Sequence, residues 1–489
     1  MTISPNTLTA LNRFGLGARY DLAEAQHQAI EADPRGYLMA QLTPESALLN
    51  TPDLDSSRIN LLINFAEAER QRMEREQAAA ALTLASASSA MAAPSATAMP
   101  AATKDMMGPP VPQLNTQPIQ REIMMAEVLA RWHKGFEDTT GIVERLVWFW
   151  SNHFAVSIAK DQAVVASAGA YEREAIRPFV LGKFADMLKA VEQHPVMLTF
   201  LDNRGSIGPD SKAGQKQNKG LNENLAREIL ELHTLGVDGG YTQADVTSFA
   251  RVITGWTWTN PNNPHFEPAT FVFVPYNHEP GEAKVLGKTY AQPGIAQGEE
   301  VLNDLARHPS TAKHLATKFA RHFVADDPPP ALVAKLAKVY LDTDGDLMAF
   351  TKALIDDDAA WTTPATKLRT PQEFIMAAAR AINYTPPADK PERILYAIND
   401  LGQPLWRPGG PNGFGDRVQD WASAEGMKMR FGWASNMAAQ ANVQGNPTEI
   451  ANIVLADAAS PETRLTIARA ESRNQGFALL LMSPEFQRR

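Results

Sequence analysis

Two glutamates, Glu228 and Glu231, lie three residues apart in the stretch NENLAREILELHTLGVDGGYTQADV, which covers 222–246. On a helix this spacing places both carboxylates on one face, with their β-carbons roughly 5–6 Å apart. Paired carboxylates favour acid–base catalysis or metal binding. Arg227 precedes Glu231 by four residues, so an ion pair between them is expected. A solvated helix face with this ion pair is the simpler interpretation.

The position of His233 disfavours a metal site on this helix. His233 follows Glu231 by two residues and Glu228 by five, and neither spacing brings the two side chains to one face. The helical di-iron pattern Glu-x-x-His needs a spacing of three. His-Glu-x-x-His and the Gly-rich nucleotide-binding patterns do not occur in the chain. We therefore predict no metal on this helix and no cofactor.

Asp202 is the candidate for a carboxylate that faces the helix carrying Glu228 and Glu231, called the glutamate helix below. Glycoside hydrolysis requires two carboxyl groups on opposite sides of the scissile bond. Glu228 and Glu231 lie on adjacent turns, so they would both approach a substrate from the same side. We therefore expect Glu228 or Glu231 to be the general acid and Asp202 the opposing catalytic group. The alternative for Asp202 is helix termination, because Asp-Asn-x-Gly suits a turn.

Several amide, imidazole, guanidinium and indole side chains could orient a substrate. The substrate-binding candidates are Asn152, His153, Asn203, Asn224, Arg227 and Trp256. Tryptophan rings provide flat apolar surfaces for binding, which suits sugar rings. For His153, the alternative is a hydrogen-bonded histidine in a core helix. The segment QPLWRPGGPNGFGDRVQDW (403–421) combines Pro, Gly and aromatic residues, which is typical of a binding loop.

Helices must position these residues, because apolar residues recur at three- and four-residue spacing along most of the chain. The predicted fold class is mainly α: a large multi-helix domain with a small β-hairpin excursion and a disordered Ala/Ser/Pro-rich insert. The hairpin is expected to pair 270–278 with 283–290 around the turn EPGE. Strand and helix patterns do not alternate along the chain, so a parallel sheet is not predicted.

The chain divides into three parts by composition. Residues 1–77 are predicted to form an N-terminal helical segment that packs on the core. Residues 78–117 are rich in Ala, Ser, Thr, Met and Pro, so we expect a low-complexity mobile insert. Residues 118–489 are predicted to form the main helical domain.

The bulk composition excludes several classes of protein. The chain has 489 residues, a net charge of -9 and no cysteine. It therefore forms no disulfide and no thiolate metal site, and its acidic balance disfavours nucleic-acid binding. No run of about twenty apolar residues predicts a membrane span. The N-terminus lacks a signal-peptide pattern, which favours the cytoplasm, or the periplasm if a signal was trimmed or a partner exports the chain.

Several stretches together resemble the bacterial family called domain of unknown function 1800. The resemblance covers nearly the whole chain and is carried by LNRFGLGA, ERLVWFWSNHF, HPVMLTFLDN, NENLAREILELHTLGVDGGYTQADV and LGQPLWRPGGPNGF. The family name implies no reaction. The resemblance also implies a possible partner, since members are often found beside an exported sulfatase-like family. One departure is Gly413-Phe414-Gly415, where the family pattern has Gly-Trp-Pro.

Three functions are compatible with these features. The first is a carboxylate acid–base hydrolase, most plausibly a glycoside hydrolase that acts on a bacterial polysaccharide. The second is a metal-dependent enzyme with His153, Asp202, Glu228 and His278 as ligands from separate segments. The third is a non-catalytic export or assembly partner of a sulfatase-like protein.

Overall fold

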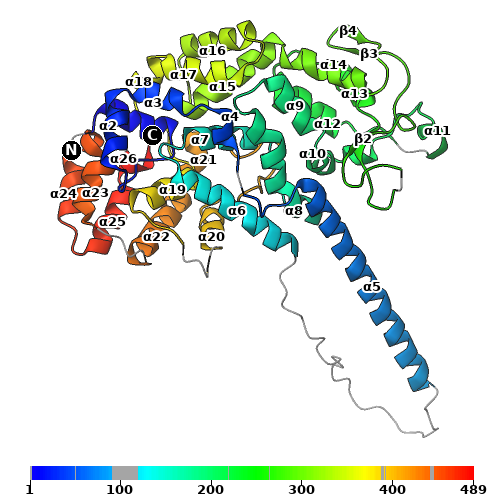
Figure 1. The fold of residues 1–489 in the computed structure, drawn as a ribbon, viewed down its shortest axis with the longest axis horizontal. Helices are drawn as coiled ribbons and strands as arrows, with labels where there is room; N and C mark the ends of the chain where they lie inside the picture. Colours follow the sequence, from blue (N-terminus) through cyan, green and yellow to red (C-terminus); the bar gives the residue numbers. More distant parts are fainter. Residues whose placement is uncertain are drawn as a thin grey trace.

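The computed structural model of the protein describes residues 3–49, 51–90, 119–217, 220–263, 265–386, 390, 392–440 and 445–489. The fold is mainly α, with two small antiparallel hairpins, as the sequence predicts (Figure 1). None of the helices in the described ranges combines the length and the apolar character needed to cross a membrane.

The N-terminal segment consists of short helices followed by a long one. Their bounds are α1 Pro5–Thr9, α2 Glu24–Ala32, α3 Pro34–Ala40, α4 Pro44–Ala47 and α5 Ser57–Ala90. The short helices α1, α3 and α4 each begin with a capping side chain (Ser4, Asp33, Thr43) followed by proline, which is a favoured helix start. The far end of α5 extends away from the rest of the molecule (Figure 1).

The first part of the insert expected at 78–117 is helical. Residues 78–90 continue α5, because alanine is the strongest helix former and this stretch is rich in it. The remainder of that segment, 91–117, lies outside the described residues.

The middle of the chain supplies the helices around the candidate sites. Their bounds are α6 Ile119–Glu137, α7 Ile142–His153, α8 Gln162–Tyr171, α9 Phe184–Glu192, α10 Pro195–Phe200, α11 Gly214–Gln217, α12 Asn224–Glu228 and α13 Gln243–Val252. The glutamate helix starts at Asn224, and its second half, Ile229–Thr234, is a π-helical turn. Such turns are rare and occur often at functional sites.

The two hairpins pair differently from the sequence prediction. Strand β1 (Trp256–Trp258) pairs with β2 (Phe271–Phe273), and β3 (Ala283–Val285) pairs with β4 (Lys288–Tyr290). The expected pairing of 270–278 with 283–290 is therefore wrong. Leu286 and Gly287 both have positive φ, as a two-residue type I′ turn requires, and this turn folds 283–290 back on itself.

The C-terminal half is again helical. Its bounds are α14 Ile295–Ala306, α15 Pro309–Phe323, α16 Pro330–Asp342, α17 Leu347–Asp356, α18 Ala359–Thr362, α19 Pro371–Ala381, α20 Arg393–Asp400, α21 Val418–Trp421, α22 Ala424–Gln440, α23 Pro447–Val454, α24 Pro461–Ala468, α25 Arg473–Met482 and α26 Pro484–Gln487. Capping boxes at Thr370 and Asn446 fix the starts of α19 and α23.

One hydrophobic cluster joins both ends of the chain, from Ala10 to Phe486. The ring of Phe14 packs 5.0 Å from Trp361 and 6.2 Å from Phe323, centroid to centroid. Residues near the N-terminus therefore belong to the same core as α15 and α18. This shared core holds α7, α15 and α19 in fixed relation, and these helices carry the walls of the first candidate site.

Candidate functional site

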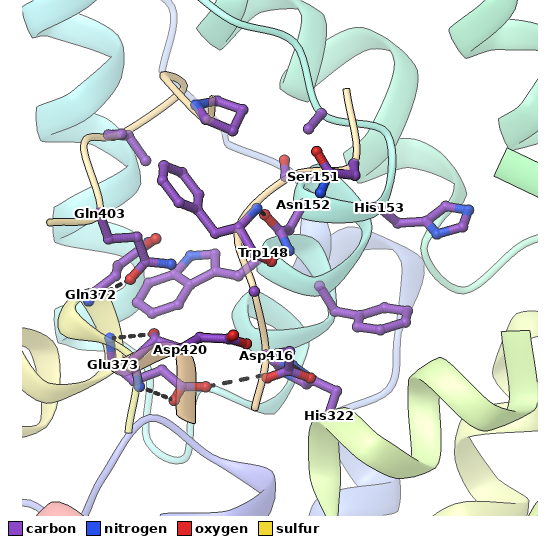
Figure 2. Close-up of a pocket in the computed structure, with 18 of the residues that line it drawn as sticks. Trp148, Ser151, Asn152, His153, His322, Gln372, Glu373, Gln403, Asp416 and Asp420 are labelled. Carbon is purple, nitrogen blue, oxygen red and sulfur yellow. Dashed lines mark hydrogen bonds and ion pairs between the residues drawn. The ribbon is translucent and has the colours of Figure 1, made fainter. Parts of the chain in front are cut away.

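A cavity of about 310 Å³ lies between the end of α7, the second half of α15, the start of α19 and the segment 403–420. Figure 2 shows the Trp148 ring, the amides of Gln372 and Gln403 and the carboxylates of Asp416 and Asp420 gathered around it. Its wall thus combines apolar aromatic surface with amide and charged groups, which is the usual composition of a small-molecule site.

The segment 413–415 is fixed to α7 by Asn152. The Asn152 amide donates to the Phe414 carbonyl at 2.9 Å and accepts from the Phe414 N–H at 2.8 Å. Gly413 has a positive φ, and a β-carbon there would lie 2.3 Å from the Asn152 carbonyl oxygen. Asn152 therefore positions one wall of the cavity, and its side-chain amide is already engaged with the protein.

His153 lies in the same wall and is fixed at both ring nitrogens. Its Nε2 lies 3.1 Å from the His233 carbonyl, and its Nδ1 lies 2.9 Å from Nζ of Lys318. A carbonyl only accepts, so Nε2 carries the proton and Nδ1 accepts from the lysine. Burial, reinforced by the charge of Lys318, lowers the pKa of His153 well below its usual value. His153 is therefore neutral.

Lys318 is the cation of the cavity with the most altered proton affinity. Burial lowers the pKa of Lys318 to about 8, Asp416 partly restores it, and Arg321 lowers it further. A lysine with a pKa near neutrality is typical of functional sites. The ammonium form still dominates at pH 7.

Glu373 and Asp416 are ionised members of a buried ion network beneath the cavity. Glu373 lies 2.7 Å from Arg145 and 2.9 Å from Arg489, and Asp416 lies 3.4 Å from Lys367. Burial alone would raise the pKa of both carboxyls. The surrounding cations, with His322 beside Asp416, hold both pKa values well below their usual range.

Asp420 differs from these two carboxylates because its side chain is exposed. One of its oxygens accepts the Arg417 N–H at 2.8 Å and so caps α21. It forms no ion pair with any residue in the described ranges. Asp420 is therefore the carboxylate of the cavity that is free to approach a ligand.

A second, open cleft of about 780 Å³ contains Asp202. Asp202 has a φ of 58°, uncommon for a residue with a side chain, and its carboxylate lies 2.6 Å from Nζ of Lys160. The Asn222 amide donates to the Asp202 carbonyl at 3.2 Å. Asn224 and Glu223 also line this cleft. Asp202 therefore meets the N-terminal end of the glutamate helix.

Glu228 and Glu231 line neither the cavity nor the cleft. Glu228 is half-buried, and burial raises its pKa. Glu231 accepts a hydrogen bond from the Tyr241 hydroxyl at 2.8 Å. Arg227 pairs with Glu223 at 3.1 Å rather than with Glu231, so that expected ion pair is wrong.

Asn203 and Trp256 are buried packing residues. The Asn203 amide donates to the carbonyls of Ile253 and Trp256 at 3.2 and 3.0 Å. Trp256 has no exposed surface, and its ring packs against Phe271 with 5.8 Å between centroids. Neither side chain lines the cavity or the cleft.

The predicted site residues therefore divide between two places. Asn152 and His153 line the cavity, whereas Asp202 and Asn224 line the cleft. The glutamate helix connects the cavity and the cleft. His153, in the cavity, bonds to the His233 carbonyl in the last turn of this helix. Asp202, in the cleft, accepts through its carbonyl from Asn222, just before the helix begins. His233 itself lies 2.7 Å from the buried Glu192.

Most charged and amide side chains of the cavity were not predicted from the sequence. Among them are Lys318, Arg321, Gln372, Gln403, Asp416 and Asp420. The Pro- and Gly-rich segment 403–421 was a usable signal for three of them. Lys318 and Arg321 lie on an ordinary amphipathic helix, where nothing in the spacing marks them.

No metal centre is formed in the part of the chain that the structure describes, where no three His, Asp or Glu side chains are grouped to hold an ion. In particular, His153 lines the cavity and Asp202 lines the cleft, so these two proposed ligands do not share a site.

Comparison with known proteins gives a family but no function. A family model described as a protein of unknown function (DUF1800) matches residues 9–488. No curated protein and no solved structure matches the chain. Because the match spans nearly the whole chain, this protein belongs to the DUF1800 family.

Proposed function

We propose that this protein is a hydrolase that binds a carbohydrate in the cavity between α7, α15 and α19. The observation that carries the proposal is the composition of one enclosed wall. Aromatic surface from Trp148, Trp406 and Phe414 lies beside the amides of Gln372 and Gln403. Sugars present both apolar ring faces and hydroxyl groups, so they need this combination of stacking surface and hydrogen-bonding groups.

Asp416 and Asp420 are the proposed catalytic carboxylates, in place of the Asp202 and Glu228 pair. Both line the cavity, and both lie on the segment that Asn152 fixes to α7. Asp416 is held ionised, which suits stabilisation of positive charge on the reacting sugar carbon. Asp420 is exposed and without an ion partner among the described residues, so it is the proposed proton-transferring group.

The Asp202 cleft is the weaker candidate for this chemistry. The cleft is open to solvent, and Asp202, which is exposed, pairs there with Lys160. Solvent screening weakens charge stabilisation in such a site. We assign the cleft no catalytic role.

The proposal is tested by a screen of bacterial polysaccharides for release of reducing sugar, with the wild type compared to Asp420→Asn. The matched control is Asp238→Asn, which changes an exposed aspartate outside both sites. We expect at least about a hundredfold loss of turnover in Asp420→Asn, as for other general acid–base groups, and none in the control. Equal activity in both variants would refute the assignment of Asp420.

A further inference from the structure

We propose that the cavity recognises an oxyanion on its substrate, a carboxylate, sulfate ester or phosphate ester, and that Lys318 and Arg321 bind it. This inference rests on the proposed carbohydrate site and names the class of sugar. Both side chains line the cavity, and they lie three residues apart on α15, a spacing that places them on one helix face.

Neither cation has a carboxylate partner in the described part of the chain. The hydrogen bond of Lys318 goes to Nδ1 of His153 at 2.9 Å, and that of Arg321 goes to the Asp326 carbonyl at 3.1 Å. No ion pair within 4.0 Å involves either residue among those ranges. Two like charges are therefore held together beside a cavity without a direct ion pair among the described residues.

The carboxylates around them already have other cationic partners, although the charge of Asp416 also acts on Lys318 from beyond ion-pair distance. Glu373 is engaged by Arg145 and Arg489, and Asp416 by Lys367. Asp326 accepts from Lys367 at 2.9 Å and from the Val418 N–H at 2.8 Å. Lys318 and Arg321 are therefore left without a direct counter-charge among the described residues, and an anionic ligand in the cavity would supply one.

The structure also orients the lysine. His153 is neutral and gives its single N–H to the His233 carbonyl, so its Nδ1 lone pair faces the Lys318 ammonium. One ammonium hydrogen is fixed by this contact, and two remain. An uncharged acceptor can hold the ammonium in place without neutralising it. This arrangement favours an anionic ligand over a neutral one.

Other groups in the wall add hydrogen-bond donors. Nε1 of Trp148 and Nε1 of Trp406 are buried and have no acceptor within the described residues. An indole N–H only donates, and a buried donor normally finds a partner. A ligand rich in acceptor oxygens would satisfy this excess, and an oxyanion on a sugar provides such oxygens.

The test measures binding by calorimetry with glucose, glucuronate, glucose 6-sulfate and inorganic sulfate as probes. The variants are Lys318→Met, Arg321→Met and Lys318→Arg, each checked for its fold by circular dichroism. Lys313→Met is the matched control, because Lys313 is an exposed lysine on the same helix and does not line the cavity.

We expect the wild type to bind glucuronate or glucose 6-sulfate at least about tenfold more tightly than glucose, since hydrogen bonds to charged groups are stronger than neutral ones. Lys318→Met and Arg321→Met should each lose at least about tenfold of that affinity, whereas Lys318→Arg and Lys313→Met retain it. Equal binding of charged and neutral sugars, binding of inorganic sulfate alone, or an equal loss in Lys313→Met would overturn the inference.

The same variants separate this inference from the proposed reaction. Asp420→Asn should abolish turnover and keep binding of the charged sugar, because it leaves both cations in place. If charged sugars bind as expected and no polysaccharide is cleaved, the hydrolase proposal fails and the oxyanion site stands. If a neutral polysaccharide is cleaved with unchanged rates in Lys318→Met, the hydrolase proposal stands and the oxyanion site fails.

Discussion

The Nζ atom of Lys318 lies 2.9 Å from Nδ1 of His153, although the two residues are 165 positions apart in the chain. The contact places a half-buried ammonium against a neutral imidazole rather than a carboxylate. A desolvated charge without a direct counter-charge destabilises a folded protein. Lys318 is therefore expected to lower the stability of the protein, in keeping with its proposed role in binding a ligand.

Replacement of Lys318 by methionine should stabilise the protein. Methionine has a similar length and needs no hydration, so the expected gain in unfolding free energy at pH 7 is at most about 3 kcal/mol, since the pKa of Lys318 is lowered from 10.5 to about 8 and one pKa unit corresponds to roughly 1.4 kcal/mol. Urea unfolding of wild type and variant measures the difference. A less stable variant would show that the ammonium contributes to the fold.

The lowered pKa of Lys318 predicts that the stability of the protein depends on pH. The folded-state pKa of Lys318 is about 8, below the usual lysine value of 10.5. Between these values the unfolded chain binds more protons than the folded one, so this group adds stability as pH rises through that window. The stability gap between Lys318→Met and the wild type should therefore narrow from pH 7 to pH 10. A constant gap in urea unfolding would contradict the lowered pKa.

Binding of a charged sugar should weaken as pH rises through about 8, because Lys318 then loses its proton. The charged or titratable groups around it are His153 and His314, whose lowered pKa values keep them neutral, Asp416, whose lowered pKa keeps it ionised, and the guanidinium of Arg321. Lys318→Arg should bind without this pH dependence, since a guanidinium remains protonated. Calorimetric titrations with glucuronate between pH 6.5 and pH 9.5 decide this point, and a pH-independent wild type would rule out the ammonium as ligand.

Replacement of Asn152 by alanine should loosen the segment 413–415 while leaving the helical core intact. The variant loses both hydrogen bonds to Phe414, with an expected cost of about 1–3 kcal/mol. Hydrogen exchange at the Phe414 amide measures the effect directly. Faster exchange confined to 403–420 is expected, and unchanged protection there would show that other contacts hold the segment.

Replacement of Glu373 by glutamine should be the most destabilising of these changes. It leaves Arg145 and Arg489 buried without their counter-charge, which typically costs about 3–5 kcal/mol. The folded-state pKa of Glu373 is depressed, so its contribution is present above the unfolded carboxyl pKa of about 4 and is lost as pH falls below it. The unfolding free energy should therefore fall less steeply with decreasing pH in the variant than in the wild type, as urea unfolding at several pH values would measure.

Glu228→Gln tests the helix from which the sequence analysis began. Glu228 lines neither site, and burial raises its pKa. Neutralisation should therefore leave turnover within about twofold of the wild type and stability equal or slightly higher, because the amide avoids the cost of a half-buried charge. A loss of turnover comparable with that of Asp420→Asn would show that Glu228 takes part in catalysis.

The sequence by itself determined the fold class and the family. Periodic apolar residues and capping side chains specify helices locally, and capping boxes at Thr242 and Thr370 fix the starts of α13 and α19. The strand pairing was not predictable to the same extent, because the turn at Leu286 and Gly287 competes with EPGE and the sequence does not rank them. The end of α5 was missed because an alanine-rich stretch is compatible both with a helix and with a low-complexity insert.

Only the tertiary structure decided which charged residues meet. Arg227 has carboxylates four residues away on both sides, and packing against α13 selects Glu223, since Gln243 and Thr247 also bind that carboxylate. His153 and Lys318 come from helices far apart in sequence, and the shared core of α7 and α15 brings them into contact. Local spacing carries no information about such pairs, because they depend on how helices pack and not on the period of any one helix.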